Sequence, residues 1–233
     1  MKDILLDDPA RAAVVYSAAS RLEPRMTLGL GSGRAVWALI EVLGTRWAGQ
    51  SPRVVVASSA TEERVIKAGF QIISLDGTVV PDVVVDGADQ VDPALNLIKG
   101  HGAALLREKL LVAASRRFLV IAEQAKFVSQ LGEGMLLPVE VARFGWSGTR
   151  RRLLGLMPEA TLRLSPDGGP LVTDEGNYIL NCQIPVGSDL TELAAAIKTT
   201  LGVLDHGLFL EMADEVLLGS PDGRVQTLAA NHI

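Results

Sequence analysis

The sequence has one cysteine, Cys182, among its 233 residues, so no disulfide can form within the chain. A chain without disulfides is typical of a reducing compartment. No stretch approaches the roughly 20 apolar residues that a membrane-spanning helix needs. The N-terminal sequence MKDILLDDPAR carries early acids and lacks the apolar run of a signal peptide. These absences predict a soluble, cytoplasmic protein with no membrane contact.

Positive charge and histidine are also scarce. The formal net charge is -5, whereas a nucleic-acid-binding surface normally has a basic excess, so we expect no nucleic-acid partner. The histidines, His101, His206 and His232, include no pair with metal-ligand spacing, and no Gly-x-Ser-x-Gly or cysteine nucleophile motif occurs. We expect no metal site and no cofactor. A small anionic substrate stays compatible with this composition, because a few local cations can hold a phosphate.

What the sequence does contain is an alternation of short apolar runs and helical segments. We expect strands at 26–30, 53–57, 72–75, 82–85 and 118–122, and helices at 9–22, 34–43, 61–68 and 103–115. This order is typical of βαβ units and of a parallel sheet that is buried on both faces. Such sheets bind ligands beyond the carboxyl ends of their strands. Polar residues follow four of the runs, at 31–32, 58–59, 86–89 and 123–126, so we expect the active site there.

The pattern changes near residue 136. We expect strands at 138–143, 160–165 and 178–184, and helices at 146–157 and 189–201, the second with Ser188 as its N-cap. This order suggests a ferredoxin-like α+β domain, and 208–219 resembles a return to the first sheet. We therefore predict an α/β protein with a Rossmann-like parallel-sheet catalytic domain, residues 1–131 plus 208–233, and a smaller ferredoxin-like domain, residues 132–207.

A glycine-rich loop, Gly29 to Gly33, links the first expected strand to a helix. Backbone N–H groups at such a turn can bind an anion. The loop is not a dinucleotide-binding fingerprint, because the third glycine of that motif would fall at Arg34 and the next strand ends in serines. Locally, phosphate binding and a tight turn without a ligand are equally compatible with these residues.

Two carboxylates, Asp86 and Asp89, lie three residues apart in a loop that Gly87 permits. Placed close together in a crevice, they would repel and hold different pKa values. Such a pair suits hydrogen bonds to sugar hydroxyls or proton transfer during ring opening. The alternatives are a helix N-cap or a metal site. A metal site is disfavoured, because no histidine or cysteine lies near this loop except His101.

Glu108 lies in a helix that is apolar nearly all round, which indicates burial. A partly buried carboxylate has its pKa raised toward the range of a general base. Arg107 and Lys109 flank it, so a structural ion pair with one of them, or with an outside residue, is an equally good interpretation of the local sequence.

In their order along the chain, these motifs resemble the ribose-5-phosphate isomerase type A family across nearly the whole sequence. The matching segments are LGLGSG (28–33), DGADQVD (86–92), LIKGHGAALLREK (97–109), LPVEV (137–141), VTDEGNYIL (172–180) and HGLF (206–209). The resemblance implies interconversion of ribose 5-phosphate and ribulose 5-phosphate through an enediolate, in the non-oxidative pentose phosphate pathway. It also implies a homodimer or homotetramer.

The resemblance further implies a role for each matched residue. Glu108 falls on the general base that carries the proton between C2 and C1. Asp86 and Asp89 fall on carboxylates that contact the sugar and assist ring opening, and Lys99 on a lysine that holds substrate and stabilises negative charge. The implied substrate contacts are Gly31, Ser32, Gly33, Arg34, Ala35, Gly87, Ala88, Gly100, His101, Gly102, Lys126 on the phosphate side, and the N-terminal cation Arg11.

The sequence departs from the family pattern in the loops around the substrate. Arg34 and Ala35 stand where the family usually has two small hydroxyl residues, the segment 58–61 is one residue short, and His101 replaces a glycine. If that backbone needs a positive φ, the histidine costs about 1 kcal/mol or more. A diverged isomerase for another sugar phosphate is therefore one alternative. A non-catalytic sugar-phosphate sensor is another, although the roughly 25 residues before the first strand are too few for a DNA-binding helix-turn-helix.

Overall fold

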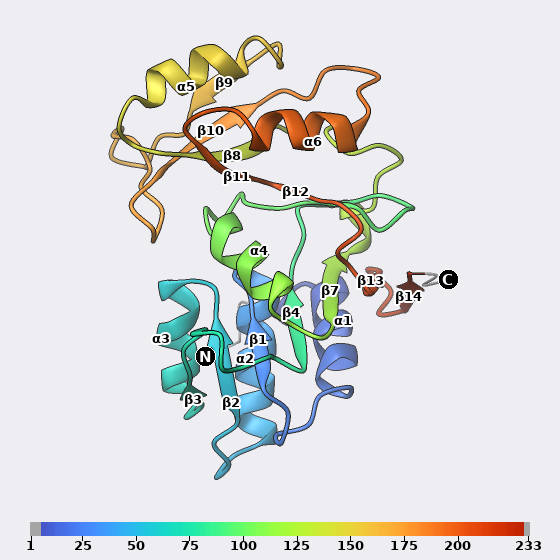
Figure 1. The fold of residues 1–233 in the computed structure, drawn as a ribbon. Coiled ribbons are helices and arrows are strands. Elements are labelled where there is room, and N and C mark those ends of the chain that lie inside the picture. The colour runs from blue at the N-terminus through green and yellow to red at the C-terminus, as the bar shows by residue number, and fades with distance from the viewer. Residues whose placement is uncertain (1–5, 231–233) are drawn as a thin grey trace.

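The computed structural model describes residues 6–230 of the chain, and its largest element is a seven-stranded sheet (Figure 1). The strand order is β14-β13-β7-β4-β1-β2-β3, and every neighbouring pair is parallel except β13 and β14. The strands are β1 (Leu28–Leu30), β2 (Arg53–Val56), β3 (Gln71–Ile72), β4 (Val83–Asp86), β7 (Phe118–Glu123), β13 (Glu215–Gly219) and β14 (Val225–Ala229). The parallel sheet predicted from the apolar runs is confirmed, with β14 as an addition that the sequence did not indicate.

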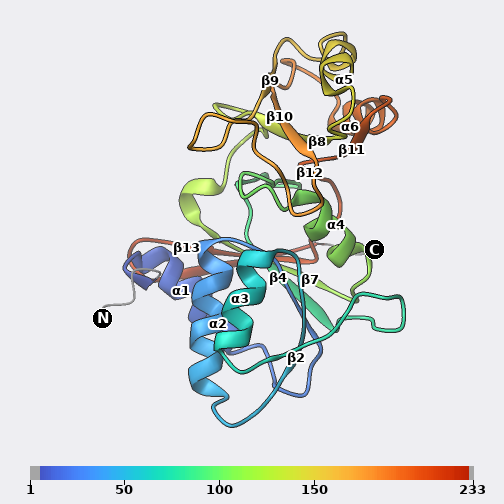
Figure 2. The same ribbon diagram turned by 90° about the vertical axis from the view of Figure 1, so that its left-hand side faces the viewer.

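Helices cover both faces of this sheet. They are α1 (Pro9–Ala19), α2 (Arg34–Arg46), α3 (Ser59–Lys67) and α4 (Leu105–Ala113), and Figure 2 shows α2 and α3 on the side away from α4. Alternate residues of β4 divide between the two cores: Val83 and Val85 pack with α1 and α2, whereas Val84 packs with Leu111 of α4. The continuous valine run is thus explained by burial on both faces.

A second, antiparallel sheet is built by the middle of the chain. Its order is β11-β8-β10-β9, and α5 (Trp146–Leu153) and α6 (Leu190–Lys198) pack on it. The strands are β8 (Leu137–Val141), β9 (Ala160–Leu162), β10 (Tyr178–Cys182) and β11 (Val203–His206). The predicted β-α-β-β-α order is confirmed, and β11, which was not predicted, completes the ferredoxin-like connection. Cys182 is fully buried in its core, and burial raises the pKa of its thiol to about 12, as expected of a packing residue.

A third sheet of very short strands lies between these two layers (Figure 1). It joins β5 (Gln90–Val91), β6 (Leu97–Ile98) and β12 (Leu208–Phe209), all antiparallel. Residue Lys99 follows β6 directly, and its backbone N–H donates to the Gly207 carbonyl oxygen. The small sheet therefore fixes the start of the loop that carries Lys99.

One predicted cap is wrong. Helix α6 is capped by Asp189, whose side chain accepts from the N–H groups of Thr191 and Glu192, while the Ser188 hydroxyl donates to the Pro185 carbonyl. Two cap-forming residues stand side by side here, and the sequence pattern does not separate them. No helix within residues 6–230 is long and apolar enough to cross a membrane.

Candidate active site

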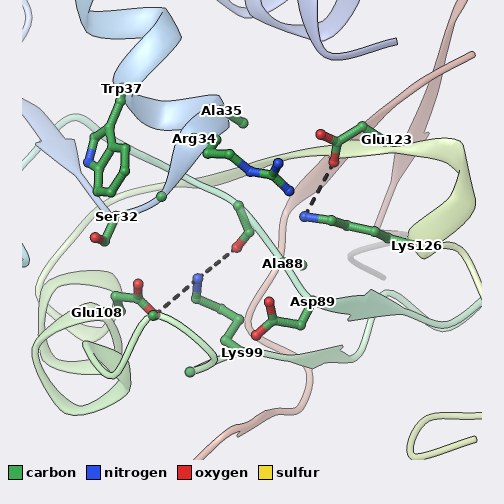
Figure 3. A pocket seen from close by; sticks show the side chains of 14 residues that line it. Ser32, Arg34, Ala35, Trp37, Ala88, Asp89, Lys99, Glu108, Glu123 and Lys126 are labelled. Carbon is green, nitrogen blue, oxygen red and sulfur yellow. Dashed lines mark hydrogen bonds and ion pairs between the residues drawn. The ribbon is translucent and has the colours of Figure 1, made fainter. Parts of the chain in front are cut away.

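A cleft opens at the carboxyl ends of β1, β4 and β7, where the sequence pattern placed the site (Figure 3). Loop 99–102 and the start of α4 form its opposite wall. The lining residues are Ser32, Gly33, Arg34, Ala35, Trp37, Gly87, Ala88, Asp89, Lys99, Gly100, Gly102, Glu108, Glu123 and Lys126. Most of the sequence-predicted contacts are thus brought together, and Asp86, His101, Arg11 and Gly31 are not among the lining residues.

The centre of the site is one ammonium group between two carboxylates. Lys99 Nζ lies 2.8 Å from Asp86 Oδ2 and 3.1 Å from Glu108 Oε2, and it donates to the Gly87 carbonyl oxygen at 2.6 Å. All three side chains are buried, with Asp86 0%, Lys99 3% and Glu108 4% exposed. Charges buried to this degree persist only when they are paired.

Asp86 occupies the end of β4 because the neighbouring loop leaves room for it. A Cβ atom on Gly31 would lie 1.9 Å from the Asp86 carboxyl carbon, so glycine is required there. The backbone N–H groups of Ser32 and Gly87 both donate to Asp86 Oδ1. Asp86 therefore lies behind Lys99 and is fully buried, and its contact with the sugar stays a prediction.

The Glu108 carboxyl is a strong proton acceptor. Burial and the nearby charge of Asp86 raise its pKa to about 8, against the opposing effect of Lys99. Burial also raises the pKa of Asp86, despite Lys99 and two backbone donors. The pKa of Lys99 is raised by Asp86 and Glu108, which outweigh its burial. A single positive charge cannot neutralise both carboxylates, so protonation of the pair is favoured over that of isolated carboxylates.

Neither neighbour in the sequence pairs with Glu108. Arg107 contacts Asp174 and Glu175 of the turn between β9 and β10, and Lys109 contacts Asp205 at 2.6 Å. The ion pair that the local sequence left open is made instead by Lys99, from a different loop.

Asp89 has its own partner, His101. Its Oδ2 atom accepts from the His101 backbone N–H at 3.0 Å and lies 3.1 Å from His101 Nδ1. Burial would raise the pKa of Asp89, but the hydrogen bonds from His101 and the charges of His101 and Lys99 hold it below its usual range. The pKa of Asp86 is raised by its burial, whereas the pKa of Asp89 is lowered by the hydrogen bonds and charge of His101 and by the charge of Lys99.

His101 contacts Asp89 and is not among the residues that line the cleft, and its substrate contact stays a prediction. Its backbone is also not strained: positive φ values in this loop fall on Gly100 (108°) and Ala103 (59°). The condition for the predicted cost, a positive φ at residue 101, is not met, so a histidine is accommodated at this position without that strain.

Cations gather at the other end of the cleft. Figure 3 shows Arg34 extending toward the pair that Lys126 forms with Glu123, whose closest atoms are 3.3 Å apart. Among the described residues, the Arg34 side chain has no ion-pair partner, and it is one of the residues that line the cleft. Arg11 is buried behind Glu123, with its Nε atom 2.9 Å from Glu123 Oε1, so it supports this end without lining it.

Two lining residues were given no individual role in the sequence analysis. Glu123 ends β7 and was expected near the active site only as part of the polar segment 123–126. No sequence signal indicated Trp37. Its ring packs under the Arg64 guanidinium, and its Nε1 donates to the Thr61 hydroxyl. The serine-threonine segment 58–61 serves structure, because the Thr61 hydroxyl donates to the Gly31 carbonyl and so fixes the glycine loop.

The cleft has a basic carboxylate beside a buried ammonium at one end and further cations at the other. This arrangement is typical of an enzyme that moves a proton within a small anionic substrate. Comparison with known proteins identifies the group. Residues 53–223 match the family model of ribose 5-phosphate isomerase A (phosphoriboisomerase A). The ribose-5-phosphate isomerase A of Roseiflexus castenholzii is 43% identical over 219 residues, which cover 93% of this chain and 94% of that protein.

Solved structures agree with this match. The ribose 5-phosphate isomerase from Plasmodium falciparum superposes with a TM-score of 0.90 at 30% identity and covers 97% of this chain and 100% of that one. A D-ribose-5-phosphate isomerase in complex with phospho-erythronic acid has a TM-score of 0.88 at 33% identity, covering 94% and 97%. The chain belongs to the ribose-5-phosphate isomerase A family, which confirms the predicted family, fold class and enzyme class.

The close approach of Gly31 and Asp86 gives a first test. We expect Gly31→Ala to lower kcat/KM about tenfold or more, because the new methyl group must displace the carboxylate that holds Lys99. Steady-state assays measure this effect, with Gly169→Ala as the control, since that glycine lies in a surface turn with space for a Cβ atom. Wild-type activity in Gly31→Ala would show that the position of Asp86 does not matter.

Proposed function

We propose that this protein interconverts ribose 5-phosphate and ribulose 5-phosphate through an enediolate, with Glu108 as the general base. The observation that carries the proposal is the buried contact of Glu108 with Lys99 at the wall of an open cleft. The cleft is lined by a base, Glu108, by a cation for developing negative charge, Lys99, and by cations for a phosphate, Arg34 and Lys126.

The proton transfer uses both groups of the ion pair. Ionised Glu108 removes the proton from C2 of the open-chain aldose, and the electron pair of that C–H bond forms the C1–C2 double bond while the carbonyl oxygen becomes an oxyanion. A proton moves from O2 to O1, and Glu108 returns its proton to C1 to give the ketose. Lys99 stabilises the oxyanion, because its ammonium is already in place before charge develops. The raised pKa makes Glu108 a stronger base than an exposed glutamate.

Asp89 supports ring opening in this scheme. It lines the cleft, and its low pKa keeps it ionised and able to accept a hydrogen bond from a sugar hydroxyl. Asp86 stabilises Lys99 from behind and is a positioning residue.

The phosphate would lie between the glycine loop and the Arg34–Lys126 end of the cleft. Arg34 supplies a charge in place of the two hydroxyl groups that the family usually has, and the start of α2 adds backbone donors. A related isomerase is described in complex with phospho-erythronic acid, a phosphorylated sugar acid. Its planar carboxylate has the charge and shape of an enediolate end, so the compound is a suitable probe of this cleft.

We also propose that the smaller domain spans residues 132–207, that the protein is a homodimer or homotetramer, and that it is cytoplasmic. Sedimentation of the purified chain tests the oligomeric state.

Glu108→Gln tests the proposed base. The amide keeps the shape of the carboxyl but cannot accept the proton, so we expect kcat to fall by about 10²–10⁴ or more. Phospho-erythronic acid should still bind, which calorimetry can measure. Glu62→Gln, an exposed acid on α3, is the matched control. Unchanged turnover in Glu108→Gln would remove Glu108 from the chemistry.

Arg34→Met tests the phosphate end. We expect KM for ribose 5-phosphate to rise about tenfold or more with little change in kcat, since a charged hydrogen bond contributes about 1.5–3 kcal/mol. The control is Arg25→Met, because Arg25 is exposed and pairs only with Glu23 among the described residues. An unaltered KM would show that the phosphate does not contact Arg34.

A further inference from the structure

Arg163, just beyond β9 in the smaller layer, reaches across to the loop of the active site. Its Nη1 atom donates to the carbonyl oxygens of Gly100 at 2.8 Å and of His101 at 3.1 Å. The rest of the guanidinium is fixed by Asn181, whose Oδ1 accepts from Nε at 3.0 Å and from Nη2 at 2.6 Å. The arginine is therefore held at both ends and spans the two layers.

The carbonyl of Gly100 and the N–H of His101 belong to one peptide unit. Arg163 holds its oxygen, and its N–H donates to Asp89 Oδ2 at 3.0 Å. The unit can adopt this orientation because Gly100 has a φ of 108° and a Cβ atom there would lie 2.8 Å from Leu105 Cδ2. A rigid planar peptide thus links the guanidinium to the carboxylate.

We propose that Arg163 is a positioning residue for Asp89, which acts by fixing the orientation of the Gly100–His101 peptide. The guanidinium polarises the carbonyl it binds and so strengthens the N–H on the other side of the same peptide. Arg163 itself is not among the residues that line the cleft. The inference rests on the proposed role of Asp89 in ring opening.

The charged and titratable groups that act on Asp89 come from several elements. They are His101 and Lys99 of the loop, Glu108 of α4 and Arg163 itself. Removing Arg163 would therefore change both a charge and a hydrogen-bond chain. A substitution that keeps the charge separates the two effects.

Arg163→Lys is that substitution. A lysine retains the charge but cannot hold Asn181 and the two carbonyl oxygens together, because it lacks the planar fork of arginine. We expect the pKa of Asp89, measured by carboxyl-carbon NMR, to rise by about half a unit or more, and kcat/KM to fall about fivefold or more. The matched control is Arg150→Lys, since Arg150 donates to the Ala160 carbonyl of β9 and makes no contact with the loop.

An Asp89 pKa and a kcat/KM that both match the wild type in Arg163→Lys would overturn the proposal. If Arg163→Lys does not fold, Asn181→Leu makes the same test, because it frees the guanidinium from its anchor and should shift the Asp89 pKa in the same direction. Asp89→Asn is assayed in parallel: full activity there would refute the proposed role of Asp89. The NMR titration would still decide whether Arg163 positions it.

Discussion

The ammonium of Lys99, buried between Asp86 and Glu108, is the interaction on which the rest of the site depends. Desolvating an ion costs several kcal/mol, so three buried charged groups must hold one another in place. The chain meets this requirement with Gly31, which leaves space for Asp86, and with the Gly87 carbonyl, which accepts from Lys99. Two carboxylates then share one cation, and burial together with the charge of Asp86 raises the pKa of Glu108 against the opposing effect of Lys99.

The site also depends on contacts between the two layers of the molecule. The loop that carries Lys99 is bonded to Gly207 at one end and to Arg163 at the other, and both of these residues follow strands of the smaller layer. Arg107 and Asp174 add a link across the same boundary. The catalytic geometry is thus a product of both layers, although nearly all lining residues come from the large sheet and its connections.

Much of this could be predicted from short-range patterns. Apolar runs followed by polar residues located the carboxyl edge of the sheet, because burial on both faces leaves a signal in each strand. The partner of Glu108 could not be found this way, since Arg107 and Lys109 are equally suitable in the sequence and only the fold brings Lys99 to it. Strands of two residues, such as β6, are too short to show a period. The positions of Arg11 and His101 relative to the cleft likewise follow from tertiary packing and not from local sequence.

The pKa of Glu108 in the folded protein tests the central claim most directly. Carboxyl-carbon NMR, with Glu108→Gln to assign the signal, measures it without relying on turnover. Deep burial and the charge of Asp86, against the opposing effect of Lys99, predict a pKa raised to about 8, so that Glu108 gains its proton as the pH falls through that value and kcat/KM declines with it. A Glu108 that titrates near its ordinary value of 4.5 would contradict the account.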